Sequence, residues 1–304
     1  MTTFDHPIGA PTVSAPTVSA LYIYPIKSAG TGVPLQQSGI GPRGLTHDRR
    51  WMVIDTAGKP VTQREFSTMR LIEVSLTEVG LVVTGPNMPV LEVPWQPLGN
   101  PRAVDMWGDF LTGVVISAQA TDWISSYLGG DFDLVFLPED SERWQPAHKP
   151  FGSLLSFVDG NPFHLISEAS LADFNRHLNR PLSYAEFRPN LVISGSEAYA
   201  EDFWQRIRIG PAESDGMAVP GAVAFEVVES CAGCAILNVM PDGTRGSEAL
   251  RTLARVRRHG KAAIFGQHLV QDAPYAQRDG HIRVGDTVDV VDFASAVNPV
   301  YVSY

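Results

Sequence analysis

Short runs of alternating apolar and polar residues dominate the chain from Leu21 onward, and glycine, proline, asparagine and aspartate separate them. Alternation with a period of two is typical of a strand with one face on a core, and the separating residues are those that form tight turns. In the first half the runs are LYIYPIK, RWMVID, RLIEVSL, GLVVTG and MPVLEVP. They predict a β-rich first domain over residues 20–138.

The second half mixes strand and helix periods. Ser170 precedes LADFNRHL, whose apolar residues recur at helical spacing, so we expect an amphipathic helix capped by Ser170. Further helices are expected over Glu248–Arg257 and, in the first domain, over Thr121–Tyr127. Strands are expected at NLVISG, FWQRIRIG, VAFEVVES, AILNVM, AIFGQHLVQ and IRVGDTVDVVD. This pattern predicts an α+β, β-rich second domain over residues 150–294.

The first residues differ from the rest, because the pentapeptide APTVS occurs twice between Ala10 and Ser19. A segment rich in proline, serine and threonine buries little apolar surface, so we expect residues 1–19 to form a disordered tail. This segment lacks the basic and apolar parts of a secretory signal, and no apolar run reaches the length of a membrane span. With only two cysteines, the chain is expected to be cytoplasmic and unprocessed.

Length and charge narrow the classes of function. With 304 residues, of which 44% are hydrophobic, the chain can bury one large core or two medium ones. The 27 glycines and 23 prolines disfavour an all-helical fold. A formal net charge of −10 repels phosphate backbones and anionic lipid, so we expect neither nucleic acid nor membrane as a partner.

The two cysteines, Cys231 and Cys234, form a CxxC motif between two expected strands. The motif permits a thiol–disulfide pair, half of a zinc site, or thiolate ligation of a soft metal. A redox pair normally opens a helix, whereas AILNVM after Cys234 predicts a strand, and zinc would need two further ligands that no second motif supplies. Packing of two small residues at a strand start is an equally good interpretation of the motif alone.

Basic side chains occur inside otherwise apolar runs, where an unpaired charge is costly. These residues are Lys27, Arg49, Arg50, Arg64 and Arg188. Cations that arrive from several segments indicate a common anionic ligand such as a phosphate. Taken singly, each arginine is better explained by extending to the surface or pairing with a carboxylate such as Asp48 or Glu65.

Together these motifs resemble the MOSC-domain family. YPIKS, GLTHDRRWMVID and VTQRE are similar to the N-terminal β-barrel domain that accompanies MOSC domains, and ISEASLADFN, FRPNLVISG, AEDFW, ESCAGC and FGQHLV are similar to the MOSC domain itself. The similarity runs from about Leu21 to about Val291. It implies an α+β, β-rich fold with a β-barrel-like first domain and a MOSC β-barrel carrying a few helices. It extends to the amidoxime-reducing components, molybdenum enzymes that reduce N-hydroxylated compounds.

The resemblance implies that the protein binds molybdenum cofactor, a molybdopterin, and that Cys234 ligates the metal. The expected cofactor-binding residues are Lys27, Ser28, Arg49, Asp159, Asn161, Arg188, Asn190, Gly233 and Gln267. The expected catalytic residues are Cys234, Asn238 and His268, and the sequence does not rank Asn238, Gln267 and His268 as proton donor. Relatives carry arginine at the position of Gly233 and an aromatic residue at that of His268, and these departures bear on the substrate.

The activity implied is the two-electron reduction of an N-hydroxylated or N-oxide compound to an amine and water. Because two cysteines cannot build a four-cysteine cluster, the electrons would come from an external flavin or iron–sulfur reductase. Two other classes of function stay open. The protein could carry sulfur as a persulfide, although no pyridoxal phosphate domain is present to load it and that cofactor is not expected. It could also bind and deliver the molybdenum cofactor without turnover.

Overall fold

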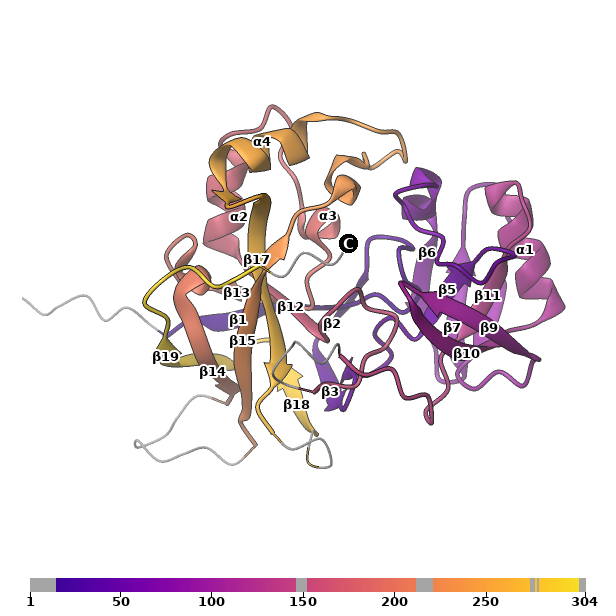
Figure 1. Ribbon diagram of the computed structural model, residues 1–304, viewed down its shortest axis with the longest axis horizontal. Helices are drawn as coiled ribbons and strands as arrows, with labels where there is room; N and C mark the ends of the chain where they lie inside the picture. Colours follow the sequence, from indigo (N-terminus) through magenta and orange to yellow (C-terminus); the bar gives the residue numbers. More distant parts are fainter. Residues whose placement is uncertain (1–14, 146–151, 212–220, 274–276, 278, 301–304) are drawn as a thin grey trace, which may run out of the picture.

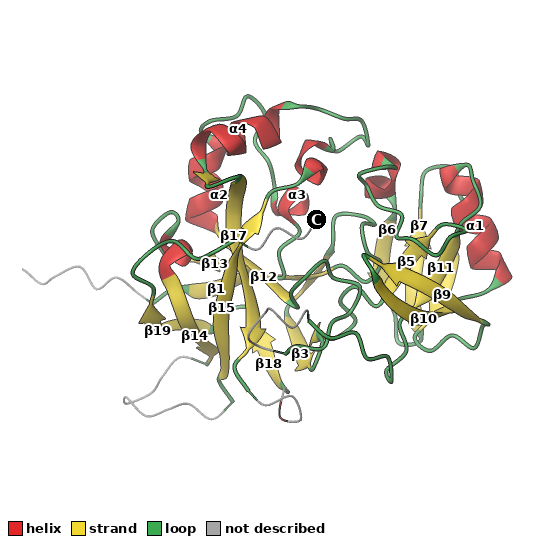
Figure 2. Cartoon of the chain, in the orientation of Figure 1, coloured by secondary structure: helices red, strands yellow, loops and turns green. Residues whose placement is uncertain are grey.

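The structure is a computed structural model and describes residues 15–145, 152–211, 221–273, 277 and 279–300. The chain forms two lobes that lie side by side (Figure 1). Strands dominate both lobes, as the sequence predicts, and the few helices lie mostly at the edges of the sheets (Figure 2). In the described residues no helix is both long and apolar enough to cross a membrane.

One lobe is a closed barrel of seven strands. The strands follow one another in the order β12 (Phe163–Ser167), β13 (Leu191–Ser194), β1 (Thr17–Ile23), β19 (Thr287–Phe293), β14 (Trp204–Gly210), β15 (Val223–Ala232) and β17 (Ala262–Gln271). Because β12 also pairs with β17, the sheet closes on itself. Alternate residues of these strands fill the interior, among them Leu21, Phe225 and Val288, all 1% exposed or less. The expected MOSC barrel is thus present.

Helices cover one end of this barrel. They are α2 (Glu168–Asn175), α3 (Tyr184–Phe187) and α4 (Glu248–Val256), with short 3-10 turns η2 (Ala200–Phe203) and η3 (Ala235–Asn238) and the two-residue strand β16 (Arg258–His259). Their apolar faces pack on Ile166, Val192 and Phe265 of the barrel wall. The helix expected over Glu248–Arg257 is confirmed, ending one residue earlier than its prediction.

The other lobe wraps two sheets around a shared core. One sheet has the order β5 (Trp51–Ile54), β11 (Asp133–Phe136), β10 (Asp109–Val115) and β9 (Pro101–Met106), and the other has β6 (Glu73–Leu76), β7 (Gly80–Thr84) and β8 (Leu91–Pro94). Helix α1 (Ala118–Leu128) and turn η1 (Ser67–Leu71) close the core, which includes Trp51, Met69 and Trp123. The arrangement is the β-barrel-like first domain that the sequence predicts.

Short strands pair segments near the start of the chain with each other and with a segment near its end. β3 (Gln37–Gly41) pairs with both β4 (Gly44–Leu45) and β18 (Gly280–Arg283), and β2 (Val33–Leu35) pairs with β1. Strand β1 itself begins at Thr17, so Thr17–Ser19 belong to the barrel and not to the expected tail. Val18 and Leu21 both enter the core although they are three positions apart, because an irregularity between Val18 and Ala20 shifts the alternation. The rest of the expected tail through residue 14 lies outside the described residues.

Two local predictions were wrong. AILNVM is not a strand, because Ala235–Asn238 form the turn η3, in which the Leu237 amide donates to the Cys234 carbonyl. Helix α2 is capped by Ser167 and not by Ser170, since the Ser167 hydroxyl accepts from the Ser170 amide at 3.0 Å. Ser170 instead donates its hydroxyl to Glu201 at 2.6 Å.

A buried ion pair joins the two lobes. Arg70, in η1, donates to the Glu186 carboxylate of α3 at 2.9 Å, and both side chains are almost fully buried. Glu186 also completes a capping box with Ser183 at the start of α3. The pair therefore fixes α3, and the residue that follows it, against the first lobe.

We expect Arg70→Ala to lower the free energy of unfolding by about 3–5 kcal/mol, because it leaves the buried Glu186 carboxylate with the longer contact to Arg180, at 3.7 Å, in place of its close partner. Denaturant titration measures this loss. The matched control is Arg176→Ala, which breaks an exposed pair with Asp173 and should cost less than about 1 kcal/mol. Equal losses in the two variants would contradict a special role for the buried pair.

Candidate active site

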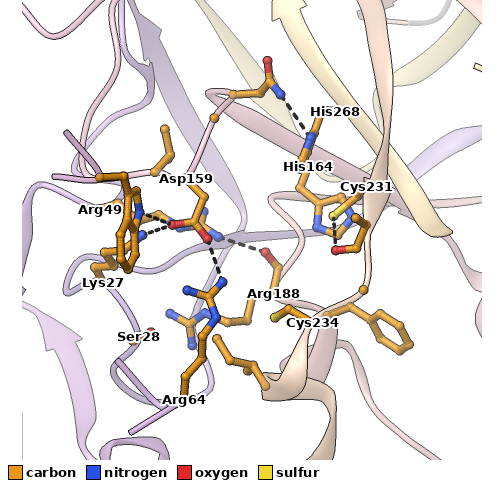
Figure 3. A pocket seen from close by; sticks show the side chains of 18 of the residues that line it. Lys27, Ser28, Arg49, Arg64, Asp159, His164, Arg188, Cys231, Cys234 and His268 are labelled. Carbon is orange, nitrogen blue, oxygen red and sulfur yellow. Dashed lines mark hydrogen bonds and ion pairs between the residues drawn. The ribbon is translucent and has the colours of Figure 1, made fainter. Parts of the chain in front are cut away.

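A cavity of about 770 Å³ opens between the lobes, within the range of pockets that hold a cofactor or a drug-sized ligand. The first half of the chain contributes Lys27, Ser28, Arg49 and Arg64 to its wall, and the second half contributes Asp159, His164, Arg188, Cys231, Cys234 and His268 (Figure 3). Segments that the sequence scatters over about 240 positions thus meet at one place. Lys27 and Arg49 line the same cavity as Cys234, as expected.

Two guanidinium groups in the wall stack on one tyrosine. The Arg49 and Arg188 guanidinium carbons lie 4.3 Å and 4.2 Å from the centroid of the Tyr24 ring. Arg49 also donates to Asp48 at 2.6 Å and to the Arg188 carbonyl at 3.0 Å. The aromatic face and these acceptors hold two like charges beside each other.

Arg188 has no carboxylate partner in the part of the chain that the structure describes. Its guanidinium donates to the backbone carbonyls of Ala29 (3.2 Å) and Gly30 (2.6 Å), and the residue is only 9% exposed. Burial and the neighbouring charge of Arg49 lower the pKa of Arg188 to about 10. The carboxylate pairing that the sequence left open is therefore absent among the described residues. The buried positive charge at the cavity is offset only from a longer distance by Asp48, which pairs with Arg49.

A second group of charges lies at Asp159, which is 55% exposed at its side chain. It accepts from Lys27 at 2.5 Å and from Arg64 at 3.3 Å. Desolvation in the cavity raises the pKa of the Asp159 carboxyl, but the two cations lower it by more, so the carboxylate stays ionised. Burial lowers the pKa of Lys27 to about 8, against the opposing effect of Asp159.

Cys234 lies at the start of η3, and its thiol lines the cavity next to Arg64. Burial raises the pKa of this thiol, although the Arg64 guanidinium and the Ile236 amide both act to lower it. In the described residues, no three histidine, cysteine, aspartate or glutamate side chains gather as a metal site. The described residues therefore form no complete ligand set around Cys234, and a soft metal bound to this thiol would bring further ligands with it.

Cys231 belongs to a separate group with two histidines. In β17, His268 lies directly opposite His164 of β12 and Glu229 of β15, so the three side chains share one face. His268 Nδ1 lies 3.2 Å from Glu229 Oε1, which leaves its other nitrogen for the Cys231 thiol. Burial raises the Cys231 pKa, but the two imidazoles lower it to about 5. Burial lowers the His268 pKa, while Cys231 and Glu229 raise it to about 10.

Three other expected residues line the cavity but are engaged elsewhere. Asn161 donates its amide to Glu229 and accepts from Gln145 at 2.5 Å. Asn190 accepts from Arg49 at 3.2 Å and donates to the Tyr22 carbonyl at 3.2 Å. Gly233 leaves no room for a side chain without movement, because an added Cβ would lie 2.6 Å from Leu253 Cδ2. The two asparagines thus orient Arg49 and the Glu229–His268 pair.

Two expected residues do not line the cavity. Asn238 accepts from the Leu250 amide at 3.1 Å and so caps the start of α4. Gln267 is 1% exposed on the other face of β17 from His268, and it donates to Asp202 at 2.8 Å. Of the three proton-donor candidates, only His268 reaches the cavity. Among the basic residues, Arg50 also lies outside it and pairs with Glu139 at 2.6 Å.

Several cavity residues were not expected as site residues, among them Arg64, Trp107, His164 and Glu229. Arg64 stood out in the sequence as a cation in an apolar run. His164 and Glu229 could not be found in this way, because they lie on other strands than His268 and alternation within one strand does not show which strands pair. Left-handed backbone is a further signal. Among the described non-glycine residues, seven have positive φ, and four of these line the cavity: Ser28, Arg49, Trp107 and Arg188. Such conformations are costly and concentrate at functional sites.

Family models match both lobes. The model described as the MOSC N-terminal beta barrel domain matches residues 15–131, and the MOSC domain matches residues 153–289. The chain belongs to the MOSC-domain family. It is 32% identical over 296 residues to mitochondrial amidoxime-reducing component 1 of Homo sapiens, covering 90% of this chain and 82% of the relative. It is 31% identical over 295 residues to the protein of the same name from Xenopus laevis, covering 89% and 81% of the two chains.

The two thiols of this MOSC-domain protein should differ in reactivity. At pH 6 we expect iodoacetamide to alkylate Cys231 faster than Cys234, because only Cys231 has a pKa below that pH. His268→Gln should slow alkylation of Cys231 at pH 6 about tenfold, since it removes one of the stabilising imidazoles. Peptide mass spectrometry of the full chain measures both rates.

The control for this experiment is His259→Gln, which changes an exposed histidine on β16 and should leave both rates unchanged. Equal alkylation of the two cysteines at pH 6, or a Cys231 rate that His268→Gln does not alter, would contradict the thiolate–imidazolium pair.

Proposed function

We propose that this protein binds molybdenum cofactor in the cavity between its lobes and reduces N-hydroxylated or N-oxide compounds to amines. The observation that carries the proposal is the buried Arg188 guanidinium, which faces the cavity without a carboxylate partner among the described residues. A phosphate supplies the missing negative charge. The names of the relatives, amidoxime-reducing components, support the class of substrate.

The residues of the cavity suit the parts of this cofactor. Arg49 and Arg188 would bind the phosphate, together with Lys27 and Ser28 on the same side of the cavity. Cys234 would ligate the metal, and one protein thiolate is sufficient because a molybdopterin brings sulfur ligands of its own. Asp159 would hold Lys27 and Arg64 in place, as it does through its two ion pairs. Asn161 and Asn190 would act as positioning residues.

When bound, the cofactor supplies the two-electron couple for cleavage of the N–O bond. The reaction also consumes two protons, since the oxygen of R–NH–OH leaves as water. His268 is the proton donor that the geometry favours, because it lines the cavity and its pKa of about 10 keeps it charged at neutral pH. Glu229 holds the ring in position and stabilises the charged form. Electrons would come from an external flavin or iron–sulfur reductase.

We expect Cys234→Ser to lower reduction of an N-hydroxylated substrate by about two orders of magnitude or more, because a hydroxyl is a poor ligand for a soft metal. Assays with a chemical electron donor, on protein from a host that makes the cofactor, measure this loss. Cys231→Ser is the matched control, and its activity should stay within about tenfold of wild type. Full activity of Cys234→Ser with molybdenum retained would contradict the assignment.

The same pair of variants separates the alternatives. Equal loss in Cys231→Ser and Cys234→Ser would favour a dithiol or persulfide mechanism. Wild-type protein that contains molybdenum and pterin but reduces nothing with a chemical donor would be a cofactor-binding or delivery protein.

Arg188→Ala should reduce molybdenum occupancy by about one to two orders of magnitude under limiting cofactor, because a charge-assisted contact contributes about 1.5–3 kcal/mol. Arg188→Lys should recover part of this, since lysine keeps the charge but loses the second donor group. Both variants lose contacts to Ala29 and Gly30, so their melting temperatures should fall as well.

Arg50→Ala provides the control, because Arg50 is a buried arginine that follows Arg49 and pairs with Glu139 outside the cavity. It should lower the melting temperature and leave molybdenum occupancy unchanged. Unchanged occupancy in Arg188→Ala would remove that residue from the proposed phosphate site.

A further inference from the structure

The hairpin between β9 and β10 turns on an unusual pair of residues. Met106 and Asp109 are paired across the hairpin, so the loop consists of Trp107 and Gly108 alone. Both have positive φ, of 58° and 94°. A two-residue loop with positive φ at both positions has the form of a type I′ turn, whose preferred sequence is Asn-Gly. Gly108 fits this preference, whereas a bulky side chain at the first position is an outlier.

Burial does not compensate for the strain at Trp107. The residue is 50% exposed, so much of its indole ring stays in contact with solvent. The turn itself is stabilised independently of the indole, because the Asp105 carboxylate accepts from the Gly108 amide at 2.8 Å. Asparagine at position 107 would therefore give a more favourable turn with the same register. The strained tryptophan has no structural advantage that the contacts of the hairpin explain.

The indole is nevertheless held in a fixed place on the cavity wall. Trp107 Nε1 donates to Asp159 Oδ1 at 3.2 Å, which links the hairpin of the first lobe to a loop of the second. The Arg64 guanidinium carbon lies 5.9 Å from the ring centroid. Arg64 also contacts Asp159 and Cys234, so the ring is separated from the Cys234 thiol by a single side chain. Figure 3 shows Arg64 between Asp159 and Cys234.

We propose that Trp107 forms a specificity-determining substrate subsite, in which the indole stacks a planar aromatic group conjugated to the reacting N–O group. This inference rests on the proposed function and assigns a residue that would favour substrates with such a ring over substrates without one. Half-exposed, rigidly held indole rings bind planar groups by stacking at little cost in side-chain entropy. Asp159 anchors the ring edge through Nε1 and Arg64 lies over the ring, so stacking requires no rearrangement of the wall.

The test compares an aryl amidoxime, benzamidoxime, with N-methylhydroxylamine, which has no ring. In Trp107→Asn holoenzyme the KM for benzamidoxime should rise about threefold to tenfold, as expected from the loss of one aromatic pair. The KM for N-methylhydroxylamine should change less than twofold, and Trp107→Phe should restore most of the benzamidoxime KM. The melting temperature of Trp107→Asn should rise by about 2–4 °C, because the turn is relieved of its strain.

Phe110→Ala is the matched control. Phe110 lies on the same hairpin and is 83% exposed, but it does not line the cavity, so neither KM should change. A benzamidoxime KM unaltered by Trp107→Asn would overturn the proposal, as would an equal rise for both substrates. Loss of molybdenum or pterin from Trp107→Asn would also overturn it, because the ring would then serve the cofactor.

Calorimetric titration of benzamidoxime separates this inference from the proposed function. If wild-type protein reduces neither compound but binds benzamidoxime, and Trp107→Asn weakens that Kd about threefold to tenfold, the subsite stands and the reductase proposal fails. If wild-type protein reduces N-methylhydroxylamine but does not bind benzamidoxime, the reductase proposal stands and the subsite fails.

Discussion

A buried guanidinium group and a partly buried one share one tyrosine ring, and among the described residues only the partly buried one has a carboxylate partner. Arg49 pairs with Asp48, while Arg188 has only backbone carbonyls as acceptors. Burying a cation in this way is costly unless an anion shares the space. The Arg70–Glu186 pair holds α3 against the first lobe, and left-handed backbone at Arg188 aims the guanidinium at the same place. The junction of the lobes therefore carries an unbalanced positive charge, to which residues of both lobes contribute.

On the other side of the cavity, strand register sets the positions of the histidine, glutamate and cysteine side chains. Strand β17 lies between β12 and β15, and His268 is paired with His164 on one side and with Glu229 on the other. Because residues in one row of a sheet point to one face, all three reach the cavity together. Cys231 follows Glu229 by two positions and so shares that face. A slip of one residue in β17 would replace His268 with Gln267, which has neither charge nor access.

Much of this arrangement is visible in the sequence because it is carried by motifs. Lys27, Arg49 and Arg188 stand out as cations in apolar runs, and Cys231 and Cys234 as an isolated pair. The choice between Gln267 and His268 is not visible in the sequence. Alternation shows that the two side chains point to opposite faces of the strand, but not which face lines the cavity. The sequence predicts a strand where Ala235–Asn238 form a turn, because a short apolar run is compatible with either structure. Trp107 reaches Asp159 through a contact over 52 positions, which no local pattern encodes.

The central claim is that the unbalanced positive charge between the lobes is the binding site of a molybdenum cofactor. The most direct test is the molybdenum and pterin content of wild-type protein from a host that makes the cofactor. The proposed function predicts close to one molybdenum and one pterin per chain, both lost when the protein comes from a host unable to make the cofactor. Protein that holds neither in the competent host, while a different anion fills the site at Arg188, would contradict the claim.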